Sequence, residues 1–275
     1  MGLIDKLIPA IPLVHKENTR FINKLRYFDE DRWKLPTRCP GWSAADIVSH
    51  MILGAQFYSH VILAGRAGKI EMPFGVNNID SFWSYRDRVG SQISVLPGLE
   101  RVEIFQDAVS TLQKEFEAIC PEDMKKEAWH WMCLSPIHSY PGQRLYELIL
   151  HDWDILNDID AELDSDSIGM AVEILDFRLP FFFNNNPDES LSGTFRFETK
   201  YPNHTWGMLV RDAHAESIVL DKEEFDASIS ISASDIILLT TGRANYSVKK
   251  KKNLVQIDGD KEKADTLMGL LCKPF

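Results

Sequence analysis

Two residues four positions apart, Glu147 and His151, carry side chains that can bind a metal ion. If their segment is helical, a step of four residues turns the chain by about 400°, which leaves both side chains on one face, about 40° apart. A third ligand is offered by His50, whose segment has the apolar positions of a buried helix. Imidazole and carboxylate ligands together suit zinc, iron or nickel. The three residues therefore predict a divalent metal site, with zinc as the first choice.

Three protein ligands leave coordination positions open, and an open position distinguishes a catalytic metal site from a closed structural one. The spacing alone has a second interpretation, because a Glu and a His four residues apart on a helix commonly form a solvent-exposed pair. Asp154 follows Glu147 by seven residues, about 20° away around the helix, so it shares the face of the ligands. Asp154 has two interpretations. It orients His151 without binding the metal itself, or it is an exposed helical aspartate.

The composition is that of a water-soluble globular protein. The 275 residues are 44% hydrophobic and 26% charged, and no apolar run approaches the roughly 20 residues that cross a membrane. A formal net charge of −11 argues against nucleic acid, whose phosphates require a clustered basic surface. The one basic run, residues 249–252, is expected to be a solvated loop or strand edge. We expect no nucleic-acid partner and no membrane partner.

The cysteines and the start of the chain indicate a cytoplasmic location. No two of the cysteines have the C-x-x-C spacing of a zinc ribbon or a redox motif, and no disulfide framework is expected. They are Cys39, Cys120, Cys133 and Cys272. The apolar start is interrupted by Asp5 and two prolines with no small-residue cleavage site after it, so we expect no signal peptide. A homo-oligomer is compatible with the sequence, but no feature decides the oligomeric state.

Helical periodicity dominates the first two thirds of the chain. Helices are expected over residues 11–28, 43–65, 100–120 and 141–157, with a short one near 81–95 and a fifth over about 167–181. The second helix begins at Ser43, an N-cap whose capping-box partner is Asp46. A bundle with the putative ligands on its second and fourth helices holds a metal in its interior.

Beyond residue 188 the hydrophobic period changes from helical to alternating. Strands of an antiparallel meander are expected over residues 194–200, 205–211, 216–220 and 227–232, followed by a helix over 234–240, a strand over 254–257 and a helix over 261–271. The polar segment 184–188 is the expected linker. The predicted fold class is α+β, with a metal-binding helical bundle in residues 1–183 and a small antiparallel α+β domain in residues 189–275.

Two motifs carry a resemblance to a known family. They are PTRCPGWSAADIVSH over residues 36–50 and LYELILHDWD over residues 145–154. With both motifs in this order, the chain resembles the mycothiol-dependent maleylpyruvate isomerase family of the DinB/YfiT-like metalloenzymes. The segments SASDIILLTTGR (232–243) and VQIDGD (255–260) resemble the sterol-carrier-like C-terminal domain of that family. The resemblance covers nearly the whole chain and implies a DinB-like bundle in which His50, Glu147 and His151 bind the metal.

The resemblance also implies an activity with a low-molecular-weight thiol, mycothiol or an analogue, as cosubstrate. The thiol would be held as thiolate at the metal. Its addition to a conjugated cis double bond, followed by rotation and departure, gives cis–trans isomerisation, whereas attack without departure gives S-transfer. Arg243, from the C-terminal domain, is implied to bind an acidic substrate as a catalytic residue. Its other interpretation is a contact with the end of the preceding helix.

Two other functions fit the same residues. Metal-assisted hydrolysis would use water in the open position, with Asp154 as the general base. A non-enzymatic carrier would bind an apolar ligand in the C-terminal domain and use the metal for structure only. A site with three protein ligands favours catalysis, and a closed site with four ligands favours the carrier.

Overall fold

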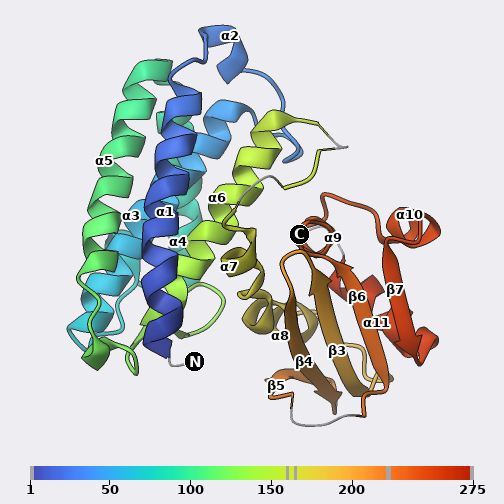
Figure 1. Ribbon diagram of the computed structural model, residues 1–275. Helices are drawn as coiled ribbons and strands as arrows, with labels where there is room; N and C mark the ends of the chain where they lie inside the picture. Colours follow the sequence, from blue (N-terminus) through green and yellow to red (C-terminus); the bar gives the residue numbers. More distant parts are fainter. Residues whose placement is uncertain (1–2, 159–160, 164–165, 221–223, 273–275) are drawn as a thin grey trace. The chain divides into compact units, whose positions relative to one another are not determined.

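The computed structural model describes residues 3–158, 161–163, 166–220 and 224–272. The chain divides into two compact units, Met1–Ala161 and Glu162–Phe275. Helices form the first unit, and a five-stranded sheet with helices forms the second (Figure 1). The predicted α+β fold class is confirmed.

The first unit is a bundle of long helices, which Figure 1 shows side by side. They are α1 (Leu3–Leu25), α3 (Ala44–Arg66), α4 (Ile79–Ser94), α5 (Gly98–Glu117) and α6 (Tyr140–Leu156). The central helix is α3, which packs against α5, α4 and α6, while α1 packs against α6 and α5. Short elements connect them, namely α2 (Glu30–Trp33), the 3₁₀ helices η1 (Pro73–Gly75), η2 (Pro121–Asp123) and η3 (Ile137–Ser139), and the strands β1 (Glu127–Ala128) and β2 (Ser135–Pro136).

The start of α3 has the capping box that its sequence predicts. The Ser43 hydroxyl accepts a hydrogen bond from the Asp46 backbone N–H at 3.3 Å, and the Asp46 carboxylate accepts one from the Ser43 N–H at 2.9 Å. By length and composition α3 is apolar enough to cross a membrane, but 67% of its most apolar window is buried inside the bundle. Its hydropathy is therefore that of a central core helix.

The helix α4 is the short helix expected near residues 81–95. The side chain of Asn78 caps it by accepting a hydrogen bond from the Ser81 N–H at 2.8 Å. Phe82 and Ile93 are its buried residues, and the helix packs along α3. On α6, Pro141 lies in the first turn, where its missing N–H costs nothing, and Asn157 ends the helix with a left-handed φ of 55°.

The second unit is a sheet in the order β5-β4-β3-β6-β7. Its elements are α7 (Ile168–Val172), α8 (Leu175–Asn184), β3 (Gly193–Lys200), β4 (His204–Arg211), β5 (His214–Ile218), β6 (Ala227–Ser232), α9 (Ala233–Thr240), α10 (Tyr246–Lys251), β7 (Val255–Gly259) and α11 (Lys261–Leu271). Alternate residues of β3 and β6, such as Phe195, Phe197 and Ile229, are fully buried. Helix α8 packs on β4 and β5, and α11 packs on β6, β7 and α8.

The expected antiparallel meander is wrong in one pairing. Strand β6 lies beside β3 and runs parallel to it, with Ala227 opposite Phe195, instead of following β5 at the sheet edge. The other pairings, β3–β4, β4–β5 and β6–β7, are antiparallel. Alternation in the sequence specifies which side chains are buried, but not which strand becomes the neighbour.

The division between the units lies after Ala161, which differs from the linker expected at residues 184–188. Asn184 is part of the second unit, because its side chain donates to the Ala215 carbonyl at 2.9 Å and accepts from the Ala215 N–H at 2.7 Å. The single helix expected over residues 167–181 is two helices, α7 and α8, which pack against α9 and the sheet. Their apolar faces identify them as helices without specifying the domain they cover.

The basic run is also different from the expected loop or strand edge, because residues 249–251 form the last turn of α10. Lys249 forms an ion pair with Asp235 at 2.6 Å, and Lys250 forms one with Asp265. Cations are favourable at this end of a helix, where the backbone carbonyls point outward. Two of the four lysines are thus paired with carboxylates of the same unit.

Candidate metal centre

Helices α3 and α6 bring His50, Glu147 and His151 together. Nε2 of His50 lies 3.6 Å from Oε2 of Glu147, and Nε2 of His151 lies 3.4 Å from the same oxygen. The three donor atoms all lie within 4.8 Å of one another. Ligands about 2.0–2.2 Å from one metal at tetrahedral angles are about 3.4 Å apart. The residues present therefore fit a divalent metal ion.

The local structure explains this convergence. Glu147 and His151 are one turn apart on α6 and face α3, while His50 lies in the second turn of α3. The side chain of His151 is only 6% exposed, whereas those of His50 and Glu147 are 24% and 22% exposed. The donor cluster is thus closed on the His151 side and accessible on the other.

Asp154 is fully buried and holds His151, so its interpretation as an exposed helical aspartate is wrong. Its Oδ2 lies 2.9 Å from Nδ1 of His151 and accepts a hydrogen bond from the Cys39 thiol at 3.4 Å. A carboxylate on one ring nitrogen fixes the tautomer and turns the other nitrogen toward a metal. His151 therefore presents Nε2 to the donor cluster.

The two histidines differ in their electrostatic surroundings. Burial and the neighbouring Arg86 guanidinium lower the pKa of His50 to about 3. The hydrogen bond with Glu147 acts to raise this pKa, but its effect is smaller. Burial also acts to lower the pKa of His151, but hydrogen bonds with Asp154, Cys39 and Glu147 raise that pKa well above its ordinary value. His50 is accordingly neutral at pH 7, the protonation state in which imidazole binds metals.

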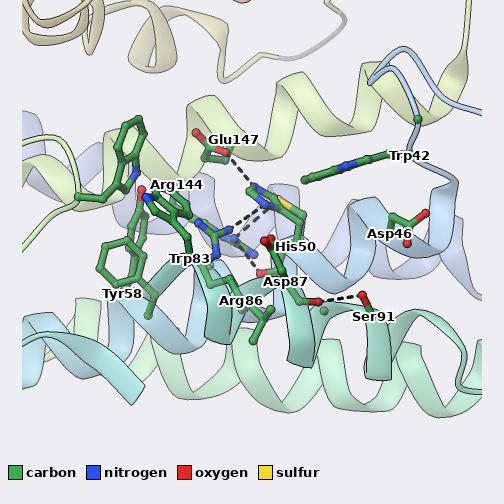
Figure 2. A pocket seen from close by; sticks show the side chains of 17 residues that line it. Trp42, Asp46, His50, Tyr58, Trp83, Arg86, Asp87, Ser91, Arg144 and Glu147 are labelled. Atoms are coloured by element: carbon green, nitrogen blue, oxygen red, sulfur yellow. Dashed lines mark hydrogen bonds and ion pairs between the residues drawn. The ribbon is translucent and has the colours of Figure 1, made fainter. Parts of the chain in front are cut away.

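Two of the three donors, His50 and Glu147, line a cavity of about 520 Å³ within the helical unit (Figure 2). Polar and charged residues from α3, α4 and α6 also line it. Aromatic side chains form another part of the wall, namely Trp42, Phe57, Tyr58, Trp83 and Trp131. A cavity of this size, with aromatic side chains and convergent polar groups in its wall, is typical of a small-molecule site.

Arg86 of α4 is a residue of this site that the sequence did not reveal. Its Nη2 lies 2.8 Å from Nδ1 of His50, and its guanidinium lies over the rings of Phe82 and Trp83, 5.5 Å from each centroid. Burial lowers the pKa of Arg86 from its usual value. The one available signal was its spacing of four residues from Phe82, the apolar residue that α4 turns toward α3.

Arg243 lies in the second unit, just after α9. Its Nη1 donates to the Thr241 carbonyl at 2.8 Å, and its backbone N–H donates to the Leu238 carbonyl at 2.8 Å. The expected contact with the helix end is therefore present. Its catalytic role stays a prediction.

Two family models match the chain. The model for the mycothiol maleylpyruvate isomerase N-terminal domain matches residues 14–156, which is more than half of the chain, and the model for the SCP-2 sterol transfer family matches residues 188–272. A search of curated protein sequences gave no match. The two family matches confirm both parts of the resemblance that the motifs indicated.

Solved structures show the same fold. The crystal structure of the mycothiol-dependent maleylpyruvate isomerase has 13% sequence identity and a TM-score of 0.62, covering 94% of this chain and 93% of that chain. A mutant of that isomerase gives the same identity and coverage with a TM-score of 0.61. Sterol carrier protein 2 like 2 from Aedes aegypti, 17% identical, covers 38% of this chain and 94% of its own with a TM-score of 0.30, too low to carry an argument. On the match to residues 14–156, the chain belongs to the mycothiol maleylpyruvate isomerase family, a family of enzymes.

Proposed function

We propose that the protein is a metal-dependent enzyme that uses mycothiol or an analogous thiol to isomerise a small, acidic, unsaturated substrate. The observation that carries this proposal is the convergence of His50, Glu147 and His151, of which His50 and Glu147 line a cavity of about 520 Å³. Family membership and the fold of the isomerase support it. Zinc suits the two imidazoles and one carboxylate, and iron or nickel would also be held.

A divalent metal in this site would supply the positive charge that keeps a thiol as thiolate at neutral pH. The residues of the chain then have separate roles. Asp154 holds the ring of His151, and aromatic side chains form part of the wall of the cavity in which thiol and substrate would meet. The thiolate adds to the conjugated double bond, the resulting single bond rotates, and the thiolate leaves. S-transfer is the outcome when the thiol stays attached.

The two other functions are less well supported by the geometry. Hydrolysis would need Asp154 as general base, but Asp154 is fully buried and its Oδ2 is engaged by His151 and Cys39. A structural metal would need a fourth protein ligand. Among the residues that the structure describes, no further His, Cys, Asp or Glu donor joins the three within 4.8 Å. An open site favours catalysis.

The first test is elemental analysis of the purified protein, followed by calorimetric titration with mycothiol, bacillithiol and glutathione. We expect about one divalent metal per chain and binding of one thiol to the metal-loaded protein. Protein stripped with a chelator should not bind that thiol, and reconstitution should restore binding. Absence of metal after reconstitution would remove the enzymatic function and leave a ligand-binding or structural protein.

A further inference from the structure

Arg86 is a half-buried cation beside the putative ligand His50. Among the described residues its only hydrogen-bond partner is Nδ1 of His50, and no carboxylate forms an ion pair with it. A guanidinium has five N–H donors in a planar fork. The negative charges of Glu147 and Asp87 act on Arg86 from beyond ion-pair distance. Its donors without an acceptor are not among the buried unpaired nitrogens, and Arg86 lines the cavity, so these donors are open to it. An anion in the cavity would accept from them.

Other buried arginines of the same unit are bonded differently. Arg144 donates to the Met51 carbonyl at 3.2 Å and to the Asn18 side chain at 3.5 Å, and Arg101 donates to the Leu96 carbonyl. These acceptors are fixed parts of the protein, and the donors of Arg101 and Arg144 that lack an acceptor are buried. Only Arg86, among these three, has a ring nitrogen of a putative metal ligand as its acceptor.

The hydrogen bond between Arg86 and His50 is incompatible with a metal on Nε2 of His50. When Nε2 of a neutral imidazole binds a metal, Nδ1 carries the ring proton and becomes a donor. A guanidinium can only donate, so the 2.8 Å contact between Nη2 and Nδ1 would lose its acceptor. Arg86 then needs a new acceptor.

The position of Arg86 limits where that acceptor can come from. Figure 2 shows its guanidinium beside His50, with Trp83 and Asp87 as neighbours on the cavity wall. The rings of Phe82 and Trp83 lie against the guanidinium and restrict its orientation. The new acceptor must therefore enter through the cavity that also contains the donor cluster.

We propose that Arg86 binds a carboxylate of the substrate by a two-point contact and so selects small unsaturated carboxylates for this site. This inference rests on the proposed function and adds a specificity residue from the helical unit itself. A planar carboxylate matches the guanidinium fork, which a lysine could not reproduce. The carboxylate held at Arg86 places the adjacent double bond next to the donor cluster, where the thiol would react.

The test uses maleate, a cis-unsaturated dicarboxylate, as the probe. Its binding to metal-loaded protein is measured by calorimetry and by tryptophan fluorescence, because Trp83 lies beside Arg86. We expect Arg86→Gln to weaken maleate binding about 10-fold to 100-fold. The matched control is Arg88→Gln, since Arg88 is exposed two residues further along α4. This control should bind maleate as tightly as the wild type.

Metal content and thiol binding are measured on each sample, which separates this inference from the proposed function. Wild-type protein that holds metal and thiol but not maleate would overturn the role of Arg86 and leave the proposed function standing. Equal maleate affinity in the wild type and in Arg86→Gln would also overturn the proposed role of Arg86. If Arg86→Gln does not fold, Arg86→Lys gives the same comparison. Loss of the planar fork should weaken binding severalfold, and unchanged binding would contradict the proposal.

Discussion

Two clusters of charged and polar side chains each include a residue of the central helix α3, and they differ in how completely their charges are paired. At its last turn, Arg66 contacts Asp123 at 3.1 Å and Glu115 at 3.3 Å, and Lys126 contacts the other oxygen of Asp123 at 2.9 Å. Each cation faces a carboxylate. This cluster ties α3 to α5 and to the segment before β1, and its charges need nothing from outside the protein.

Near the start of α3 the charges are matched less completely. Glu147 faces both histidines, but among the described residues no carboxylate lies within ion-pair distance of Arg86, on which Glu147 and Asp87 act from further away. The comparison indicates where a ligand would bind, because a cation with free donors on a cavity wall gains hydrogen bonds when an anion enters. We therefore regard the Asp123 cluster as structural and the His50 cluster as functional. Variants of residues in both clusters test this distinction.

Removing a ligand from the functional cluster should have the largest effect. His50→Ala and His151→Ala each leave two donors, so we expect stoichiometric metal to be lost and thiol-dependent turnover to fall by about 10³-fold or more. Elemental analysis and activity assays measure both. The matched control is His60→Ala, because His60 is also on α3 but is exposed, 3.9 Å from Glu71. Full metal content in His151→Ala would contradict the assignment.

Asp154→Asn should have the next largest effect. It removes the carboxylate that fixes His151 but keeps its size, so metal affinity should fall by about 10-fold to 100-fold while the fold is retained. Competition with a chromophoric chelator measures the affinity. Cys39→Ser is the control, because a hydroxyl also donates to Asp154. An Asp154→Asn affinity within twofold of the wild type would show that the carboxylate does not position His151.

Asp123→Asn should affect stability without affecting the metal. Asp123 is 3% exposed and accepts from Arg66, Lys126 and the Cys120 N–H. Loss of these charge-assisted hydrogen bonds should lower the free energy of unfolding by about 2 kcal/mol, measured by urea denaturation. Metal content should equal that of the wild type. A parallel loss of metal would mean that the two clusters on α3 are coupled.

The same cluster predicts a pH dependence. Burial acts to raise the pKa of Asp123, but the hydrogen bonds from Lys126, Cys120 and Arg66 prevail and hold that pKa well below its usual value. The folded pKa is therefore below the unfolded value of about 3.9, so the stabilisation is complete above that pH and declines as the pH falls below it. The difference in unfolding free energy between the wild type and Asp123→Asn should shrink below about pH 4. If the difference in unfolding free energy between the wild type and Asp123→Asn stayed constant down to pH 2, the lowered pKa of Asp123 would be contradicted.

The sequence predicted the putative ligand set and the helices that carry it, because a four-residue step and a capping box are local properties of the chain. It did not reveal Arg86, since the contact of Arg86 with His50 depends on how α4 packs along α3. The burial of Asp154 was left open for the same reason. In the second unit, the parallel pairing of β6 with β3 depends on the path of the connecting chain, and alternation carries no information on that path.

Ser43→Ala should have the smallest effect and tests whether the functional cluster depends on the end of its helix. The substitution removes the hydroxyl that caps α3 through the Asp46 N–H, which should cost about 1 kcal/mol of stability. Ser84→Ala, at an exposed position within α4, is the control and should be neutral or slightly stabilising. Metal affinity should stay within twofold of the wild type, because His50 is seven residues beyond the cap and is held by the packing of α3 on α6. A loss of metal affinity as large as that of Asp154→Asn would mean that the capped start of α3 positions His50.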